Sequence, residues 1–302
     1  MSEINVYQSS GDEVDLMEIF YVLWSEKWLG LGITAFATAV SILVALSISD
    51  VYRAETTLVP AETRQSASPL AAQLGGAASI LGINIGGGES SRVSKAIAVL
   101  QSREFIGEFL KKHNAVVPLF AGQWDSEKGT STFNSEIFDD QTQQWKNPAL
   151  VPTELQAYRA FSNILQITQD MESGIIKVSI EWKDPVLAQY WVNSIIGDLN
   201  RKVKEADLTE ATNAIEFLRR QLESTSLIEM QRVFYGLIES QIRVSMLADV
   251  REEYAFQVID VAVVPDEASY PNRPLIVLMG VFVGIILSVL AILAKWLRFR
   301  KV

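Results

Sequence analysis

Residues 265–294 read PDEASYPNRPLIVLMGVFVGIILSVLAILA, a proline-spaced approach followed by an apolar run. The run itself, residues 275–294, is 20 residues long and contains no charged side chain. As a helix it would be about 30 Å long, which matches the hydrocarbon thickness of a bilayer. Each of Pro265, Pro271 and Pro274 fixes φ and disfavours helix in the residue before it. We therefore predict a stiff, extended junction that leads into a transmembrane helix.

Small residues recur within this run at intervals of four. Gly280, Gly284 and Ser288 form small-x3-small pairs, which let another helix approach closely. Such pairs also arise by chance. We expect these three residues to mark a contact between helices.

A second uncharged run lies near the start of the chain, at residues 28–48. Its 21 residues would form a helix about 31 Å long. The alternative is a cleaved signal peptide, but the preceding residues 1–27 are acidic rather than basic and the run exceeds the usual apolar core of a signal peptide. We therefore predict a second, uncleaved transmembrane helix.

The distribution of basic residues predicts the orientation. Residues 295–302 hold four basic side chains, whereas only Arg273 lies close before the second apolar run. Because basic flanks stay in the cytoplasm, the C-terminus is expected to be cytoplasmic. Two crossings then place both termini on the same side and residues 50–270 in the bacterial periplasm, which the absence of Cys also fits. The predicted location is the inner membrane.

The composition excludes several classes of protein. The chain has no Cys and a single histidine, His113, so disulfides, thiol nucleophiles, Cys/His zinc sites and histidine-based triads are excluded or nearly so. The net charge of −10 argues against binding to nucleic-acid phosphates. Acidic residues are plentiful, but no spacing singles out a catalytic pair. We therefore expect no enzyme activity, cofactor or metal. His113 follows two lysines and is expected to be a surface residue at a helix C-terminus.

The segment before the first apolar run has helical periodicity. Leu16, Ile19, Phe20 and Leu23 follow an i, i+3, i+4, i+7 spacing within residues 14–24. This predicts an amphipathic helix that lies on the membrane. A docking helix for a cytoplasmic partner is the alternative.

The first part of the periplasmic region predicts an α/β base. Strand patterns, a helical period and an irregular stretch alternate along it. The predicted strands are residues 52–59, 164–169, 174–182 and 256–264, the helix is residues 91–112, and the irregular stretch is residues 113–152. Residues 64–90 are rich in Gly, Ala and Ser and predict a mobile loop. This loop lacks the Gly-Lys-Ser/Thr ending of a phosphate-binding loop.

A long helical region follows the base. No proline occurs between Pro185 and Pro265, yet the strand at residues 256–264 must return the chain to the membrane. The simplest solution is a long helical hairpin over residues 185–255. The cluster Ser224-Thr225-Ser226 has poor helix propensity and is the predicted turn, with Gly236 as the second choice.

Both arms of the hairpin carry apolar seams with three- and four-residue spacing, which indicates helix packing against helix. The seam residues with a predicted packing role are Ile215, Leu218, Leu222, Leu227, Met230, Phe234, Leu237 and Val244. Further apolar residues lie off the seam and widen the face, namely Ile228, Tyr235, Ile238 and Ile242. We infer contacts between protomers. The alternative is that one arm is buried more deeply against the base.

The predicted fold class is an α+β membrane protein, in which two transmembrane helices flank a periplasmic α/β base with a long protruding helical hairpin. The predicted organisation is a cytoplasmic segment at 1–27, a transmembrane helix at 28–48, the base at 50–184, the hairpin at 185–255, a return strand and proline-rich junction at 256–274, a transmembrane helix at 275–294 and a basic tail at 295–302.

These features resemble the Wzz family of bacterial polysaccharide chain-length determinants, also called polysaccharide co-polymerases. The resemblance runs almost from end to end, and the proline-rich junction with its following span is the most specific part. The residues that carry it are the acidic amphipathic start at 14–24, Ser102-Arg103-Glu104-Phe105, Asp260-Val-Ala-Val-Val-Pro265 and the glycine-containing second span.

The resemblance implies a ring-shaped homo-oligomer, expected to be an octamer, with no enzyme activity of its own. It implies as partners an inner-membrane polymerase and a lipid-linked glycan, whose modal length the ring sets. Because the chain ends shortly after the second span, the kinase-free branch that acts on O-antigen or a related polymer is expected.

One alternative from another class of protein is a periplasmic adaptor that bridges an inner-membrane pump to an outer channel through a helical hairpin. Such an adaptor would need a lipoyl-like β-domain split by the hairpin and usually has one span. Here the predicted strands are few and a second span follows the hairpin.

Overall fold

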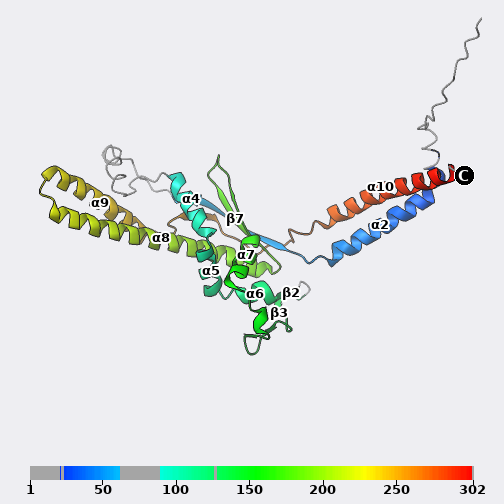
Figure 1. Ribbon diagram of the computed structural model, residues 1–302, viewed down its shortest axis with the longest axis horizontal. Helices are drawn as coiled ribbons and strands as arrows, with labels where there is room; N and C mark the ends of the chain where they lie inside the picture. Colours follow the sequence, from blue (N-terminus) through cyan, green and yellow to red (C-terminus); the bar gives the residue numbers. More distant parts are fainter. Residues whose placement is uncertain (1–20, 22–23, 62–88, 126–127, 301–302) are drawn as a thin grey trace, which may run out of the picture. The chain divides into compact units, whose positions relative to one another are not determined.

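The computed structural model describes residues 21, 24–61, 89–125 and 128–300. The chain forms two compact units, residues 1–50 with 269–302 and residues 51–268 (Figure 1). The predicted amphipathic segment lies outside the described residues, apart from Tyr21 and Trp24. The glycine-rich loop lies outside them as well, up to residue 88.

The first unit is a pair of antiparallel helices that lie side by side, α2 (Lys27–Ser47) and α10 (Arg273–Arg300). Both are long and apolar enough to cross a membrane, with mean hydropathies of 2.2 and 3.0. They match the two runs predicted from the sequence. Helix α10 begins two residues earlier than predicted, so Pro274 lies in its first turn and not in an extended junction. Proline is tolerated there because the first helical N–H groups have no partner within the helix.

The second unit is built on a four-stranded antiparallel sheet in the order β6-β7-β1-β8. Its strands are β1 (Tyr52–Pro60), β6 (Leu165–Gln169), β7 (Ile176–Trp182) and β8 (Phe256–Asp260). As predicted, alternate side chains of β7 point to one face, where Ile176, Val178 and Ile180 are fully buried. This face of the sheet lines one side of the hydrophobic core.

Two long helices lie between β7 and β8 in the chain, α8 (Pro185–Ser224) and α9 (Ile228–Val250). Asp184 starts α8 by accepting hydrogen bonds from the N–H groups of Val186 and Leu187, and Pro185 occupies the first helical position. The first half of α8 packs on β1 and β7, and its second half packs along α9. The turn lies between Ser224 and Ile228, as the sequence predicts. The predicted fold class, an α+β chain with apolar helices at both ends and a long helical hairpin, is confirmed.

The helix predicted at residues 91–112 is two helices, so that expectation is wrong. The structure has α4 (Glu89–Leu100) and α5 (Arg103–Lys112), with a break at Gln101 and Ser102. The break has a local cause: the Ser102 hydroxyl accepts a hydrogen bond from the Phe105 N–H and caps the new helix.

Residues 113–152 are also more regular than predicted. They contain α6 (Val116–Ala121), two short hairpins and a 3₁₀ turn. The hairpins are β2 (Gly122–Asp125) with β3 (Thr130–Phe133) and β4 (Phe138–Asp139) with β5 (Gln144–Trp145), and the turn is Pro148–Leu150.

Helix α7 (Glu154–Ile164) follows this region and was missed in the sequence. Its start carries a capping box, in which the Thr153 hydroxyl accepts from the Gln156 N–H and the Gln156 side chain accepts from the Thr153 N–H. The Thr-x-x-Gln spacing was the available signal.

The return strand is shorter than the predicted 256–264, because β8 ends at Asp260. The ladder between β1 and β8 shifts its register between Thr57 and Leu58 and reaches no further than Asp260. Beyond that point the backbone of Ala262 is bound by Asn193 of α8 instead.

Candidate functional site

The helix pair α2/α10 is in close contact along a row of small residues. A Cβ atom on Gly280 would lie 2.2 Å from the Ser41 Oγ atom, and one on Gly284 would lie 3.0 Å from the Ala37 Cβ and the Thr34 Cα atoms. Farther along, Gly30 faces Ser288 and Ile292. The glycines of the second span therefore allow it to approach the first span of the same chain.

The first span contributes a matching row that the sequence analysis did not recognise. Gly30, Thr34, Ala37, Ser41 and Ala45 recur at intervals of three or four and contact or face α10. Their hydroxyls donate to carbonyl groups of their own helix, for example Thr34 Oγ1 to Gly30 O at 2.9 Å. This leaves no hydroxyl proton unsatisfied at the contact, as an apolar surrounding requires.

An ion pair joins the two helices at each end. The Arg273 guanidinium donates to both Asp50 carboxylate oxygens at 2.9 and 3.1 Å, and the Lys295 ammonium donates to Glu26 at 2.6 Å. Each pair places charged groups where an apolar helix pair would reach polar surroundings. Together they restrict sliding of one helix along the other.

The three junction prolines lie in different surroundings. Pro265 is half-buried, Pro271 is buried and Pro274 is exposed at the start of α10.

The hairpin has its own small core. Leu218 of α8 packs with Phe234 and Leu237 of α9, and all three are buried. Leu222 is half-buried and packs against them, and Ile215 and Val244 are half-buried as well. Leu227 and Met230 are 67% and 41% exposed, so their predicted place in the seam is wrong within one chain. Both lie next to the turn, where α8 has already ended.

A second apolar stripe on α9 is exposed. It consists of Ile228, Tyr235, Ile242 and Met246, which are between 41% and 68% exposed. Their spacings of seven, seven and four place them along one line of the helix. These residues are not buried against the base, so the alternative raised from the sequence does not hold within one chain.

Two asparagines of α8 bind the return segment. The only signal of this in the sequence is that two poor helix formers lie seven residues apart on an apolar face. The Asn200 amide donates to Phe256 O at 2.9 Å, and its oxygen accepts from the N–H groups of Ala255 and Phe256 at 2.8 Å. Asn193 makes the same two-way contact with Ala262 at 3.0 Å. The amide side chains thus take the place of a neighbouring strand.

The segment before β8 is fastened to α8 by a tyrosine as well. The Tyr254 hydroxyl donates to Asp207 Oδ2 at 2.9 Å. Burial and the Asp207 carboxylate raise the pKa of Tyr254 to about 12, so that the phenol keeps its proton at neutral pH. Lys95 of α4 binds the other oxygen of Asp207 at 3.0 Å. Helix α4, helix α8 and the return segment therefore meet at one carboxylate.

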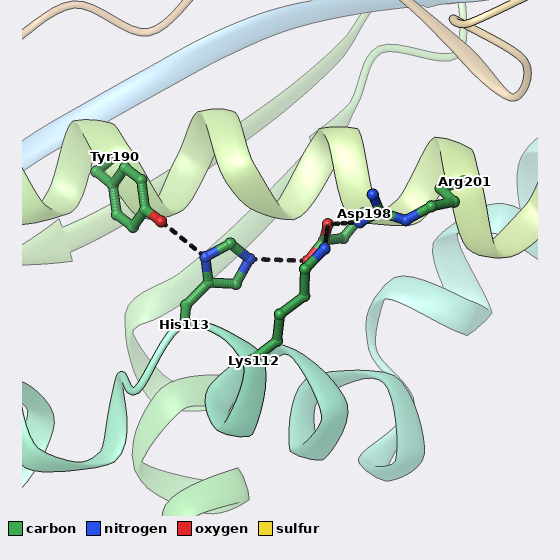
Figure 2. A network of polar contacts seen from close by, with 5 residues as sticks. All are labelled: Lys112, His113, Tyr190, Asp198 and Arg201. Carbon is green, nitrogen blue, oxygen red and sulfur yellow. Dashed lines mark hydrogen bonds and ion pairs between the residues drawn. The ribbon is translucent and has the colours of Figure 1, made fainter.

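The single histidine belongs to a polar network between α5 and α8 (Figure 2). His113 is the C-terminal cap residue of α5, as predicted, but its side chain is only 12% exposed, so the expectation of a surface residue is wrong. Its Nε2 atom lies 2.9 Å from Asp198 Oδ2, and its Nδ1 atom lies 2.9 Å from the Tyr190 hydroxyl. Lys112 and Arg201 contact the remaining oxygen of Asp198.

Asp198 is the centre of this network. Burial alone would raise its pKa, but the hydrogen bonds from Lys112 and His113 and the charges of Lys112 and Arg201 outweigh burial and lower it. The carboxylate is therefore ionised at neutral pH and holds α5 against α8. Among the described residues no group of three or more His, Cys, Asp or Glu side chains could hold a metal ion.

The fold and these contacts define a class: an α+β protein with two apolar helices that pair through small residues, and a long helical hairpin. Two domain families match the chain. Residues 12–113 match the Wzz family, described as chain length determinant protein, and residues 231–297 match the G-rich domain on putative tyrosine kinase. The matches span 102 and 67 residues, 169 of 302 in all. The chain therefore carries a Wzz chain length determinant domain in its first part and a G-rich domain of the kind found on putative tyrosine kinases in its last part.

The matched ranges contain the residues on which the resemblance was based. Ser102 to Phe105 lie in the first match, and Pro265, Pro271, Pro274 and the second span lie in the second. The predicted family is therefore confirmed.

Solved structures show the same likeness. A full-length bacterial polysaccharide co-polymerase is 11% identical, with 95% of this chain and 99% of that chain covered and a TM-score of 0.43. A fragment of WzzB, a polysaccharide co-polymerase from Salmonella Typhimurium, is 13% identical, with 74% and 100% covered and a TM-score of 0.30. Both TM-scores are below 0.5, so the assignment rests on the two domain matches. No curated protein matches the chain.

The asparagine contacts predict a large loss of stability on substitution. Asn200→Ala would leave the peptide groups of Ala255 and Phe256 without their side-chain partner, at about 1–3 kcal/mol for each buried unsatisfied group. We expect the free energy of unfolding to fall by about 2–4 kcal/mol. The matched control is Asn213→Ala, at an exposed position of the same helix. Thermal unfolding of the detergent-solubilised protein would measure both, and equal midpoints for the two variants would contradict the role of Asn200.

The Asp198 network predicts a dependence of stability on pH. Because the folded pKa of Asp198 is lowered, its contribution is complete above the ordinary Asp pKa of about 3.9 and is lost as the pH falls through the folded pKa. We expect Asp198→Asn to be less stable than the wild type at pH 7 and the difference to shrink towards pH 3. Denaturant unfolding at several pH values would show this. A difference that stays constant would mean that the charge contributes nothing.

Proposed function

We propose that this protein sets the modal chain length of a bacterial surface polysaccharide, without catalysing a reaction itself. The observation that carries the proposal is the pair of family matches, which include both apolar helices and much of the domain between them. Chain-length regulation is what the name of the first family describes. The adaptor alternative has no support from either match.

The protein would work as a homo-oligomer in the inner membrane, with both termini in the cytoplasm and residues 50–270 in the periplasm. The exposed stripe on α9 supports the oligomer, because apolar side chains in a heptad-like line need a partner surface. An octameric ring, a polymerase partner and a lipid-linked glycan such as O-antigen are the finer parts of this proposal.

Within this proposal the junction and the glycines have distinct roles. Pro265, Pro271 and Pro274 would lead the chain from the domain into the membrane. Gly280, Gly284 and Ser288 would hold the second span against the first. The seam from Ile215 to Val244 would shape the hairpin, while Leu227 and Met230, which are exposed next to the turn, would contact a neighbouring protomer.

A gel of surface polysaccharide tests the function and the helix contact together. In a strain that lacks the gene, we expect the modal cluster of band lengths to disappear and the wild-type gene to restore it. Gly284→Leu should restore only a shifted distribution, because its side chain would collide with Thr34 and Ala37. Gly32→Leu, which meets nothing within 4 Å, is the control and should restore the wild-type pattern.

Two results of that gel would count against the proposal. A ladder that does not change when the gene is removed would contradict chain-length control. A normal distribution from Gly284→Leu, at a wild-type protein level, would remove the helix contact from the mechanism.

The exposed stripe predicts that charge on α9 disrupts assembly. Tyr235→Lys and Ile242→Lys would place an ammonium in each copy of the proposed interface, so we expect a smaller oligomer in light scattering of the solubilised protein. Glu216→Lys is the control, since residue 216 is an exposed position of α8 outside the stripe. Oligomers of wild-type mass from both stripe variants would show that the stripe is not the interface.

A further inference from the structure

The helix pair α2/α10 has an open groove along one side, separate from the close contact through Gly280 and Gly284. The groove has a volume of about 750 Å³. It is lined mainly by α2, from Lys27 to Ile42, with Val289 and Ile292 of α10 on the other side. The helix rises about 22 Å from Lys27 to Ile42, which exceeds the roughly 15 Å of one leaflet of a hydrocarbon core.

The wall of the groove is suited to a hydrocarbon chain. Ala35 and Ala39 line it with methyl groups, and the hydroxyl side chains that also line it are satisfied within their own helices. Thr38 donates to Thr34 O at 2.8 Å, and Ser288 donates to Ile285 O at 2.9 Å. No hydroxyl donor is left for a polar ligand to bind, so the body of the occupant is apolar.

One end of the groove carries a cation. The Lys27 ammonium lies 5.3 Å from the centroid of the Trp24 ring and makes no ion pair with any residue that the structure describes. Its neighbour Glu26 is already paired with Lys295. An occupant that fills the groove and also neutralises Lys27 must therefore bring its own negative charge.

The aromatic residues around Lys27 place this end at the level of lipid headgroups. Tyr21, Trp24 and Trp28 are 77%, 64% and 77% exposed. Exposed Trp and Tyr at the end of an apolar helix are typical of the membrane–water interface. Lys27 therefore lies where a lipid phosphate would be.

We propose that this groove binds one anionic glycerophospholipid, with an acyl chain along Ala35 and Ala39 and its phosphate at Lys27. The choice of a phospholipid rests on the topology given under the proposed function, since that topology places Lys27 in the cytoplasmic leaflet, where anionic phospholipids are concentrated. A neighbouring helix could fill the groove, but it would not by itself neutralise Lys27. The bound lipid would make the helix pair sensitive to the anionic lipid content of the membrane.

Native mass spectrometry of the solubilised full-length protein tests this proposal. The probes are phosphatidylglycerol and phosphatidylcholine with identical acyl chains, and undecaprenyl phosphate as a third lipid. We expect the wild type to retain phosphatidylglycerol in preference to phosphatidylcholine. Lys27→Gln should lower that retention about fivefold, the worth of one lysine at an anionic surface. Arg298→Gln is the matched control, because it removes a cation near the same end of the helix pair that does not line the groove.

A second variant tests whether the groove binds the acyl chain of the lipid. Ala39→Leu fills the groove without changing the charge, so it should lower the retention of both glycerophospholipids.

Equal retention of the two glycerophospholipids by the wild type, or equal losses from Lys27→Gln and Arg298→Gln, would overturn the site. Preferential binding of undecaprenyl phosphate would overturn the choice of a phospholipid. A smaller oligomer from Ala39→Leu with lipid retention unchanged would identify the groove as a helix contact. Lipid retention is measured without any polysaccharide, so this test can fail while the chain-length function stands.

Discussion

The strands β1 and β8 pair although they are far apart in sequence, and this pairing constrains everything between them. The Thr56 hydroxyl donates to Asp260 O at 2.7 Å across 204 residues of chain. Strand β1 follows the first apolar helix directly, and β8 leads towards the second. Because both strands are neighbours in one sheet, the chain must return after the 40 residues of α8. Helix α9, which runs antiparallel to α8, provides this return. Closing so long a loop costs chain entropy, and the buried core must offset it.

The closure depends on polar groups as much as on apolar ones. The sheet and the first half of α8 bury large side chains such as Trp191, Phe256 and Leu58. Asn200 is also buried, but both its amide nitrogen and its amide oxygen are hydrogen-bonded to the return segment. In the same way, the Asp198 carboxylate holds α5 against α8. Buried polar groups of this kind are costly if their partners are absent, so they favour one arrangement of the elements over others.

The sequence predicted the elements better than it predicted their contacts. The apolar runs, the β6–β7 hairpin and the turn near Ser224 follow from local periodicity and propensity. The break at Ser102 and the helix that starts at Thr153 were not predicted, although the Ser102 cap and the Thr-x-x-Gln capping box are both local signals. The seam positions Leu227 and Met230 remain exposed within one chain, because a heptad pattern does not show where the partner helix ends.

By itself the sequence determined that the chain has two apolar helices, a sheet of alternating strands and a long hairpin. These elements can be predicted because hydrophobic periodicity and segment length are properties of one element alone. It also marked Gly280 and Gly284 as places of close approach. Only the tertiary structure decided that their partner is the first span, that Asn193 and Asn200 bind the return segment and that His113 is enclosed beside Asp198. Such contacts join residues between about 55 and 250 positions apart, and no local pattern encodes which of many compatible partners will meet. The packing of the whole chain selects them.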